Sequence, residues 1–117
     1  MAFKFENLRV WELALDYSLE INKLIKKFPN EEKYVLAQQL QRAADSIALN
    51  IAEGSTGQSN AEFKKFLGYS IRSGIEVVGC LHLGRKRAII VEDDFLFLYA
   101  SLENLIIKLQ SLRNNIN

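Results

Sequence analysis

The chain has 117 residues, of which 49% are hydrophobic and 25% are charged, and its formal net charge is +1. This balance predicts one soluble globular domain, residues 1–117, and argues against a disordered chain or a strongly basic nucleic-acid domain. The only cysteine is Cys80, which excludes an internal disulfide and a cysteine-based zinc site. No segment approaches the run of about 18 apolar residues that a membrane span needs. The N-terminus lacks the pattern of a signal peptide, so we expect a cytoplasmic protein without membrane contact.

The first predicted helix covers about residues 8–28. Its apolar side chains recur at steps of three and four: Val10, Leu13, Tyr17, Ile21, Leu24 and Phe28. Pro29 ends this helix, and Asn30 can cap a second helix over about residues 30–53. Gly54 is a suitable residue to end that second helix.

The second predicted helix carries a ridge of polar side chains, spaced so that they share one face. They are Gln39, Arg42, Ser46, Asn50 and Glu53. Small apolar residues flank the ridge, so we expect the helix to pack closely on neighbours that include other copies of the chain. Polar groups buried there need partners. We expect Arg42 to pair with Glu76 or Glu53, and Asn50 to close the helix near Gly54, in a network that fixes helix register or a subunit interface.

The remaining sequence predicts two further helices. Ser59 and Glu62 have the spacing of a capping box, which predicts a third helix over about residues 60–84. Gly74 and Gly79 lie inside it at a cost of roughly 1 kcal/mol each relative to alanine, so we expect another helix to approach closely there. A fourth helix is predicted over about residues 92–114. Its apolar residues follow the steps of left-handed helix packing: Phe95, Leu98, Leu102, Leu105, Leu109, Leu112 and Ile116. The four segments predict an all-α, antiparallel up-and-down four-helix bundle.

Catalytic patterns are missing from the sequence. His82 is the only histidine, and Cys80 lies two positions before it, where helical side chains point in different directions. The segment Gly54-Ser55-Thr56-Gly57 lacks the lysine and the preceding strand of a phosphate-binding loop. Charge at a helix N-terminus explains Glu92-Asp93-Asp94 better than a metal ion does. We therefore predict a non-enzymatic protein with no catalytic residue, no metal site and no cofactor.

Basic side chains form two groups that can bind phosphate. Lys64, Lys65 and Arg72 share one side of the third predicted helix, and a compact cluster follows Gly84. This cluster consists of Arg85, Lys86 and Arg87. Such groups bind RNA or DNA through charge and counterion release. A solvated surface is the competing explanation, although an oligomer would repeat each group around its axis and strengthen the field.

Five segments of the chain resemble one protein family. They are Phe5-Glu6-Asn7-Leu8-x-Val10-Trp11, Phe28-Pro29-Asn30-Glu31-Glu32, the stretch from Gln39 to Gly54 with its Arg42-Ala43-Ala44 and Asn50-Ile51-Ala52-Glu53-Gly54, Glu62-Phe63-x-x-Phe66-Leu67, and Ser73-x-x-Glu76. Together they resemble the four-helix-bundle proteins encoded in bacterial 23S rRNA intervening sequences. That family includes relatives that accompany the reverse transcriptases of diversity-generating retroelements. The resemblance covers nearly the whole chain.

The resemblance implies a homopentameric, barrel-like ring that associates with nucleic acid rather than catalysing a reaction. Asp45 and Arg72 depart from the aliphatic and small residues that are usual in the family at these positions. The leading hypothesis is modest binding of RNA or DNA, with the RNA that encodes the protein as one candidate partner. The alternative is a protein-interaction scaffold in which exposed Phe3, Phe5 and Trp11 dock a neighbour or another protein. Salt distinguishes the two, because phosphate binding weakens steeply with salt.

Overall fold

The computed structural model describes residues 3–32, 34–57 and 59–117, and the regular elements within these residues are all helical. Four long α-helices make up most of the fold. They are α1 (Arg9–Ile25), α2 (Leu36–Ser55), α3 (Asn60–Lys86) and α4 (Glu92–Asn114). Two short 3-10 helices, η1 (Lys4–Asn7) and η2 (Asn30–Glu32), precede α1 and α2.

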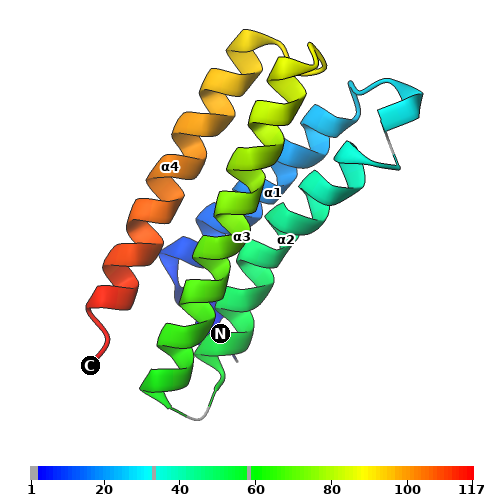
Figure 1. Ribbon diagram of the computed structural model, residues 1–117. Coiled ribbons are helices and arrows are strands. Elements are labelled where there is room, and N and C mark those ends of the chain that lie inside the picture. The colour runs from blue at the N-terminus through cyan, green and yellow to red at the C-terminus, as the bar shows by residue number, and fades with distance from the viewer. Residues whose placement is uncertain (1–2, 33, 58) are drawn as a thin grey trace.

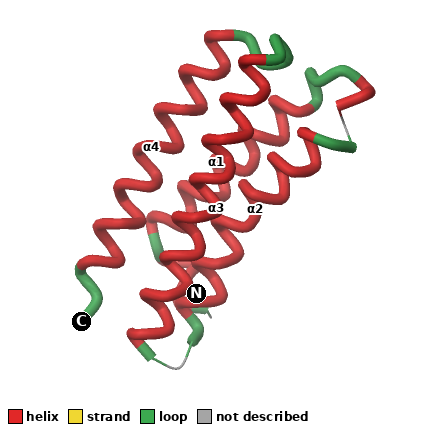
Figure 2. The backbone as a smooth tube through the Cα atoms, viewed as in Figure 1, coloured by secondary structure: helices red, strands yellow, loops and turns green. Residues whose placement is uncertain are grey.

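Each α-helix packs on the next one in the chain, and α4 returns to contact α1. Consecutive helices run in opposite directions, so the four lie side by side as an elongated body of 43 × 22 × 20 Å (Figures 1 and 2). The contact between α2 and α3 is the most extensive, and the contact between α1 and α4 is the least extensive. The predicted all-α class is confirmed, and the arrangement is consistent with an up-and-down bundle.

The core lies along the bundle axis and contains most of the apolar residues that the helical periodicity predicts. Its largest fully buried aliphatic side chains are Ile21, Leu36, Leu40, Ile47, Ile51, Leu67, Leu81, Leu102, Leu105 and Leu109. Burying one such side chain contributes about 1.5–3 kcal/mol relative to leaving it exposed. The core also contains the hydroxyl of Ser70, which donates a hydrogen bond of 2.9 Å to the backbone oxygen of Ile47. That bond satisfies the buried hydroxyl and links α3 to α2.

The predicted start of the second helix is wrong. Asn30 begins the short turn η2, in which the Glu32 amide donates to the Pro29 carbonyl oxygen at 3.0 Å, and α2 begins only at Leu36. Residue 33, inside the predicted range, lies outside the described residues. At the other end, Gly54 lies within the last turn of α2 rather than after it. A methyl group at Gly54 would overlap the Cβ atom of Phe66, so glycine is needed there for the approach of α3.

The predictions for the start and the glycines of the third helix have different outcomes. The Ser59 hydroxyl accepts a hydrogen bond of 3.1 Å from the Glu62 amide, which confirms the N-terminal cap. A methyl group at Gly74 would lie 3.0 Å from Cδ1 of Ile106 in α4, which confirms a close helix approach. The same expectation for Gly79 is wrong, because no described atom outside its own helix lies within 4 Å of a methyl group built there.

Helix α4 is apolar on more than its core side. In the described chain it alone has the length and composition to cross a membrane, with a mean hydropathy of 1.2 over 18 residues, of which 28% are buried. A core helix of a bundle passes the same test, and α4 does pack a buried seam on its neighbours. However, Leu96, Phe97 and Ile107 are all more than half exposed. The helix therefore exposes large apolar side chains outside the core.

Candidate functional surfaces

The two predicted basic groups lie at opposite ends of α3. Lys64 and Lys65 are in its second turn, whereas Lys86 is its last residue. A rise of 1.5 Å per residue puts Lys65 and Lys86 about 30 Å apart along the helix. The structure therefore separates the two groups into distinct surfaces, with Arg72 two turns from Lys65 on the first of them.

Arg113 of α4 joins the first basic group. Its guanidinium lies over Gly68, which is one turn from Lys64 and one turn from Arg72. A methyl group at Gly68 would be 3.5 Å from a terminal nitrogen of Arg113, 3.6 Å from Cζ and 3.8 Å from Nε, so the guanidinium lies flat across the bare helix surface. We call Lys64, Lys65, Arg72 and Arg113 the α3–α4 basic cluster. Arg113 is not among the site residues predicted from the sequence, although a glycine midway between Lys64 and Arg72 is a signal that another side chain can pack there.

The α3–α4 basic cluster has no acidic partners among the residues that the structure describes. The ion pairs found in these residues involve other side chains. Lys65 and Arg72 are exposed, and Lys64 and Arg113 are partly exposed. Their positive charges are therefore accessible to an anion from solvent.

The second basic group is partly neutralised by its neighbours. A terminal nitrogen of Arg85 lies 3.4 Å from the carboxylate of Glu92, and the guanidinium also covers the ring of Phe95 at 3.7 Å. Arg87 lies 3.9 Å from Glu32. Surface pairs of this kind contribute about 0–1 kcal/mol, so an incoming phosphate can displace them. Their carboxylates still reduce the positive potential, which makes this group the weaker of the two.

The polar ridge of α2 is mostly in contact with solvent. Gln39, Arg42 and Glu53 are exposed, while Ser46 and Asn50 are partly buried. Arg42 approaches Glu76 of α3 at 3.9 Å, which is one of the two expected partners, but its side chain remains 78% exposed. The ridge therefore lacks, within one copy of the chain, the close packing that the sequence predicts. Its role at a subunit interface stays a prediction.

The prediction that Asn50 closes α2 near Gly54 is wrong. Its side-chain nitrogen donates to the backbone oxygen of Ser46 at 2.8 Å and to the Ser46 hydroxyl at 3.2 Å. Asn50 thus bonds back toward the preceding turn of its own helix.

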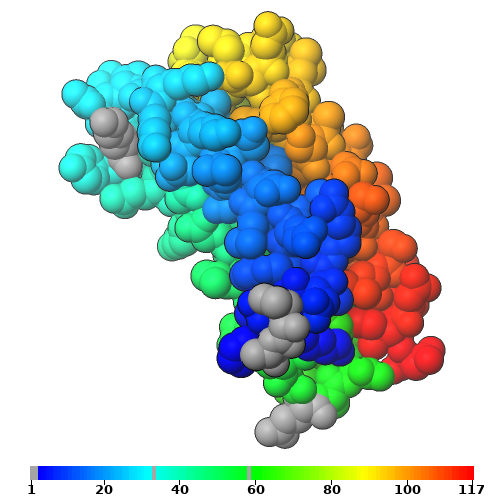
Figure 3. All heavy atoms as spheres, turned by 180° about the vertical axis from the view of Figure 1, so that it is seen from behind, coloured from blue at the N-terminus to red at the C-terminus, as the bar shows by residue number. Residues whose placement is uncertain are grey.

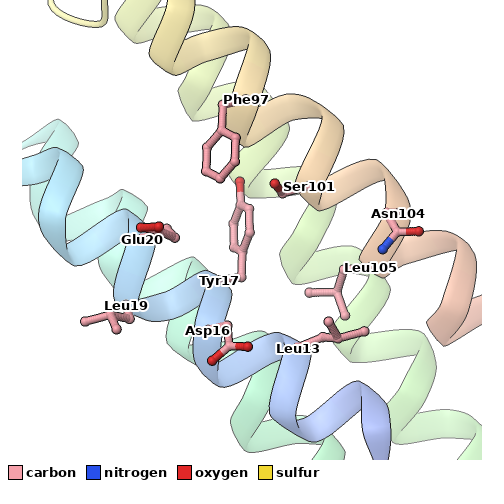
Figure 4. Close-up of a pocket in the computed structure, with 9 residues that line it drawn as sticks. All are labelled: Leu13, Asp16, Tyr17, Leu19, Glu20, Phe97, Ser101, Asn104 and Leu105. Carbon is pink, nitrogen blue, oxygen red and sulfur yellow. The ribbon is translucent and has the colours of Figure 1, made fainter.

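A groove of about 430 Å³ runs between α1 and α4, which lie side by side on the face seen in Figure 3. It is lined by Leu13, Asp16, Tyr17, Leu19, Glu20, Phe97, Ser101, Asn104 and Leu105 (Figure 4). Leu13 and Leu105 lie close together at one end, and the Tyr17 ring points from α1 toward α4. The two carboxylates, Asp16 and Glu20, both come from α1, so the groove has an apolar base and one acidic wall.

The residues considered for catalysis do not form a reactive site. Cys80 is buried, and this burial, with a smaller effect from the charge of Glu76, raises the pKa of its thiol. His82 is exposed on another side of α3, against the rings of Phe95 and Tyr99. Across the described ranges, no three His, Cys, Asp or Glu side chains gather in a way that suits a metal ion.

The N-terminal aromatic residues pack on one another, which corrects their expected exposure. The ring centroids of Phe5 and Trp11 are 4.6 Å apart in an edge-to-face contact, and both side chains are partly buried. Phe3 stacks on Phe5 at 6.0 Å and is 57% exposed. Of the three rings expected to dock a partner, only Phe3 is largely accessible.

Comparison with known proteins identifies the family of this chain and a solved structure with a similar fold. A family model described as the 23S rRNA-intervening sequence protein matches residues 6–111. The chain belongs to the 23S rRNA-intervening sequence protein family. Among solved structures, it is similar to a protein of unknown function from the S23 ribosomal protein family of Bacteroides thetaiotaomicron. The two are 25% identical with a TM-score of 0.85, over 91% of this chain and 96% of that chain. No curated protein matches the chain.

The match to the 23S rRNA-intervening sequence family confirms the family resemblance seen in the sequence. The matched region includes α2 with its polar ridge. The similar solved structure is itself described as having unknown function. These comparisons therefore support the family and the fold without assigning an activity.

Proposed function

We propose that this member of the 23S rRNA-intervening sequence family is a non-enzymatic, homo-oligomeric protein of the cytoplasm that binds RNA or DNA with modest affinity. The observation that carries the proposal is the position of Arg113 over Gly68. It brings a fourth cation to Lys64, Lys65 and Arg72, none of which has an acidic partner in the described residues. The secondary surface consists of Arg85, Lys86 and Arg87.

The α3–α4 basic cluster suits phosphate better than it suits a protein partner. Arginine presents two parallel donors to a phosphate, and lysine adds a point charge. If the four cations each neutralise one phosphate, the logarithm of the binding constant falls with the logarithm of salt concentration at a slope of about −3.6 for duplex DNA. A net charge of +1 on the whole chain keeps this binding modest. The homopentameric ring implied by the family resemblance would repeat the cluster five times.

Fluorescence polarisation with a labelled structured RNA and a labelled DNA duplex, at about 50 to 200 mM salt, tests the proposal. We expect saturable binding that weakens with salt. Replacing Lys64, Lys65 and Arg72 by alanine should remove most of it, and replacing Arg85, Lys86 and Arg87 should remove less. The control, which we call the α1 control, replaces Lys23 of α1 and Lys26, the residue that follows Ile25; both are exposed. It should leave binding unchanged.

A protein-interaction scaffold is the second candidate, and the exposed apolar side chains of α4 favour it. Leu96, Phe97 and Ile107 are large apolar side chains that are more than half exposed to water. The absence of RNA and DNA binding at about 50 mM salt would reject the nucleic-acid proposal and favour this one. If the α1 control weakens binding as much as the replacement of Lys64, Lys65 and Arg72 does, binding depends on the total charge of the protein and not on the α3–α4 basic cluster.

A further inference from the structure

Helix α2 presents a second, outward seam with the spacing of a helix that docks against other helices. Beginning at Val35, the residue just before α2, exposed or partly exposed residues follow one another at steps of four and three: Val35, Gln39, Arg42, Ser46, Leu49 and Glu53. Such steps keep a row of side chains on one face along a helix. Val35 and Leu49 are 60% and 62% exposed. We call these six residues the outer seam of α2.

The outer seam of α2 places one cation between two apolar residues. Arg42 is seven residues from Val35 and seven from Leu49, which is about 10 Å in each direction along the helix. Its nearest acidic group, in Glu76, is at the long distance of 3.9 Å. The guanidinium is therefore able to reach a carboxylate on another molecule without losing a strong bond.

The groove between α1 and α4 has the opposite pattern. Asp16 lies on its wall without an ion pair to any described residue, and Glu20 has only Lys23, at 3.7 Å. Apolar side chains stand beside these carboxylates, with Phe97 58% exposed on the α4 side (Figure 4). The groove is thus concave, apolar and acidic, whereas the outer seam of α2 carries an arginine between two exposed apolar residues.

We propose that the outer seam of α2 in one copy of the chain docks in the α1–α4 groove of the next copy, with Arg42 facing Asp16 and Glu20. This inference rests on the self-association included in the proposed function. Charge complementarity favours a second copy as the occupant, since every copy carries both surfaces. The two surfaces differ, so the contact is head-to-tail, which closes into a ring when the rotation between copies allows it. The α3–α4 basic cluster lies outside both surfaces and stays accessible.

The mass of the purified protein in solution, measured by light scattering over a concentration series without nucleic acid, tests this contact. Phe97→Asp in the groove and Leu49→Asp on the seam should each convert a multimer to the 13.4 kDa monomer. Leu96→Asp is the matched control, because Leu96 is 54% exposed on the same helix but does not line the groove. It should keep the wild-type mass.

Exchanging the charges of Arg42 and Asp16 tests their pairing more directly than the apolar substitutions do. Arg42→Asp and Asp16→Arg should each weaken assembly, and the double variant should restore it because the pair is reversed. Arg72→Glu, an equal change of charge outside both surfaces, should keep the mass and lower nucleic-acid binding.

Three outcomes overturn the proposed contact. A monomeric wild type rejects both this contact and the self-association in the proposed function. A multimer that survives the Phe97 and Leu49 variants rejects only these surfaces. A double variant that assembles no better than Arg42→Asp alone rejects the pairing of Arg42 with Asp16.

Discussion

The phenol of Tyr17 in α1 donates a hydrogen bond of 3.0 Å to the backbone oxygen of Leu98 in α4. Tyr17 is buried at the base of the α1–α4 groove, where these two helices make the least extensive contact between neighbours in the bundle. A buried hydroxyl without a partner would cost free energy, so this bond both satisfies Tyr17 and sets the distance between the helices that form the groove.

Replacing Tyr17 by phenylalanine should lower the free energy of unfolding by about 0.5–1.5 kcal/mol, the usual net contribution of one such hydrogen bond. Urea denaturation followed by circular dichroism measures the change. The matched control is Tyr99→Phe, because Tyr99 lies at the bundle surface and forms no hydrogen bond through its hydroxyl within the described chain. Equal losses in the two variants would mean that the bond to Leu98 contributes nothing specific.

The same tyrosine makes stability depend on pH in the alkaline range. Burial raises the pKa of Tyr17 above its ordinary value of 10.0, because the charged phenolate is poorly solvated in the core. The folded state therefore binds the proton more tightly than the unfolded state does. The stabilisation is complete below pH 10 and is lost as the pH rises above that value.

Urea denaturation at about pH 8 and again about one unit above the ordinary tyrosine pKa should show this loss. Tyr17→Phe lacks the titrating group, so its stability should fall less over the same interval. Other groups titrate equally in both proteins and cancel from the difference. An identical fall in the wild type and in Tyr17→Phe would contradict the assignment.

Two glycines should respond in opposite ways to alanine. No described atom outside its helix lies within 4 Å of a methyl group at Gly79, so Gly79→Ala should raise the free energy of unfolding by about 1 kcal/mol through helix propensity. At Gly54 the methyl group would overlap Cβ of Phe66, an atom fixed to the backbone of α3. Gly54→Ala should therefore destabilise the protein, since the two helices must move apart. Thermal unfolding of both variants measures these changes in stability. A stabilised Gly54→Ala would contradict the close approach of α2 and α3 at this residue.

The sequence predicts the core of this fold well because the apolar periodicity records it directly. Five of the seven predicted positions are buried in α4, while Leu112 in its last turn and Ile116 just beyond the helix are partly exposed. The exact start of a helix is harder to predict from the sequence than its buried face. Asn30 has the right chemistry for a cap, but the chain makes the turn η2 before α2 begins at Leu36.

The candidate surfaces were less predictable than the core, since they depend on residues far apart in the sequence. The spacing of Lys64 and Arg72 is visible in the sequence, but the arrival of Arg113 from α4 requires knowledge of how α3 and α4 pack. The polar ridge of α2 differs from the basic cluster, because its pattern is visible in the sequence but its packing partner is not found within one copy of the chain. Its pattern predicts close packing that one copy of the chain does not supply, and this shortfall is what suggests a second copy.

Asp45 links α1 to α2 through a network of short polar contacts. The Ser18 hydroxyl donates to its carboxylate at 2.5 Å, and the side-chain nitrogen of Gln41 donates to it at 2.9 Å. Hydrogen bonds to a charged group contribute more than neutral ones, so Asp45→Ala should cost about 1.5–3 kcal/mol. A double-mutant cycle with Ser18→Ala isolates the pairwise part. Additive losses would show that Ser18 and Asp45 do not interact measurably, and Asp45→Ala without any loss would show that an apolar residue serves equally well here.

Arg113 should contribute one phosphate contact if the α3–α4 basic cluster binds nucleic acid. Arg113→Gln removes one charge, so the magnitude of the slope of log binding constant against log salt should fall by about one. The matched control is Lys108→Gln, because Lys108 is an exposed cation on the same helix that carries no ion pair with described residues and does not reach Gly68. Its slope should equal that of the wild type. If both variants lower the slope equally, the position of the guanidinium over Gly68 has no special role, and if neither does, phosphates bind elsewhere on the protein.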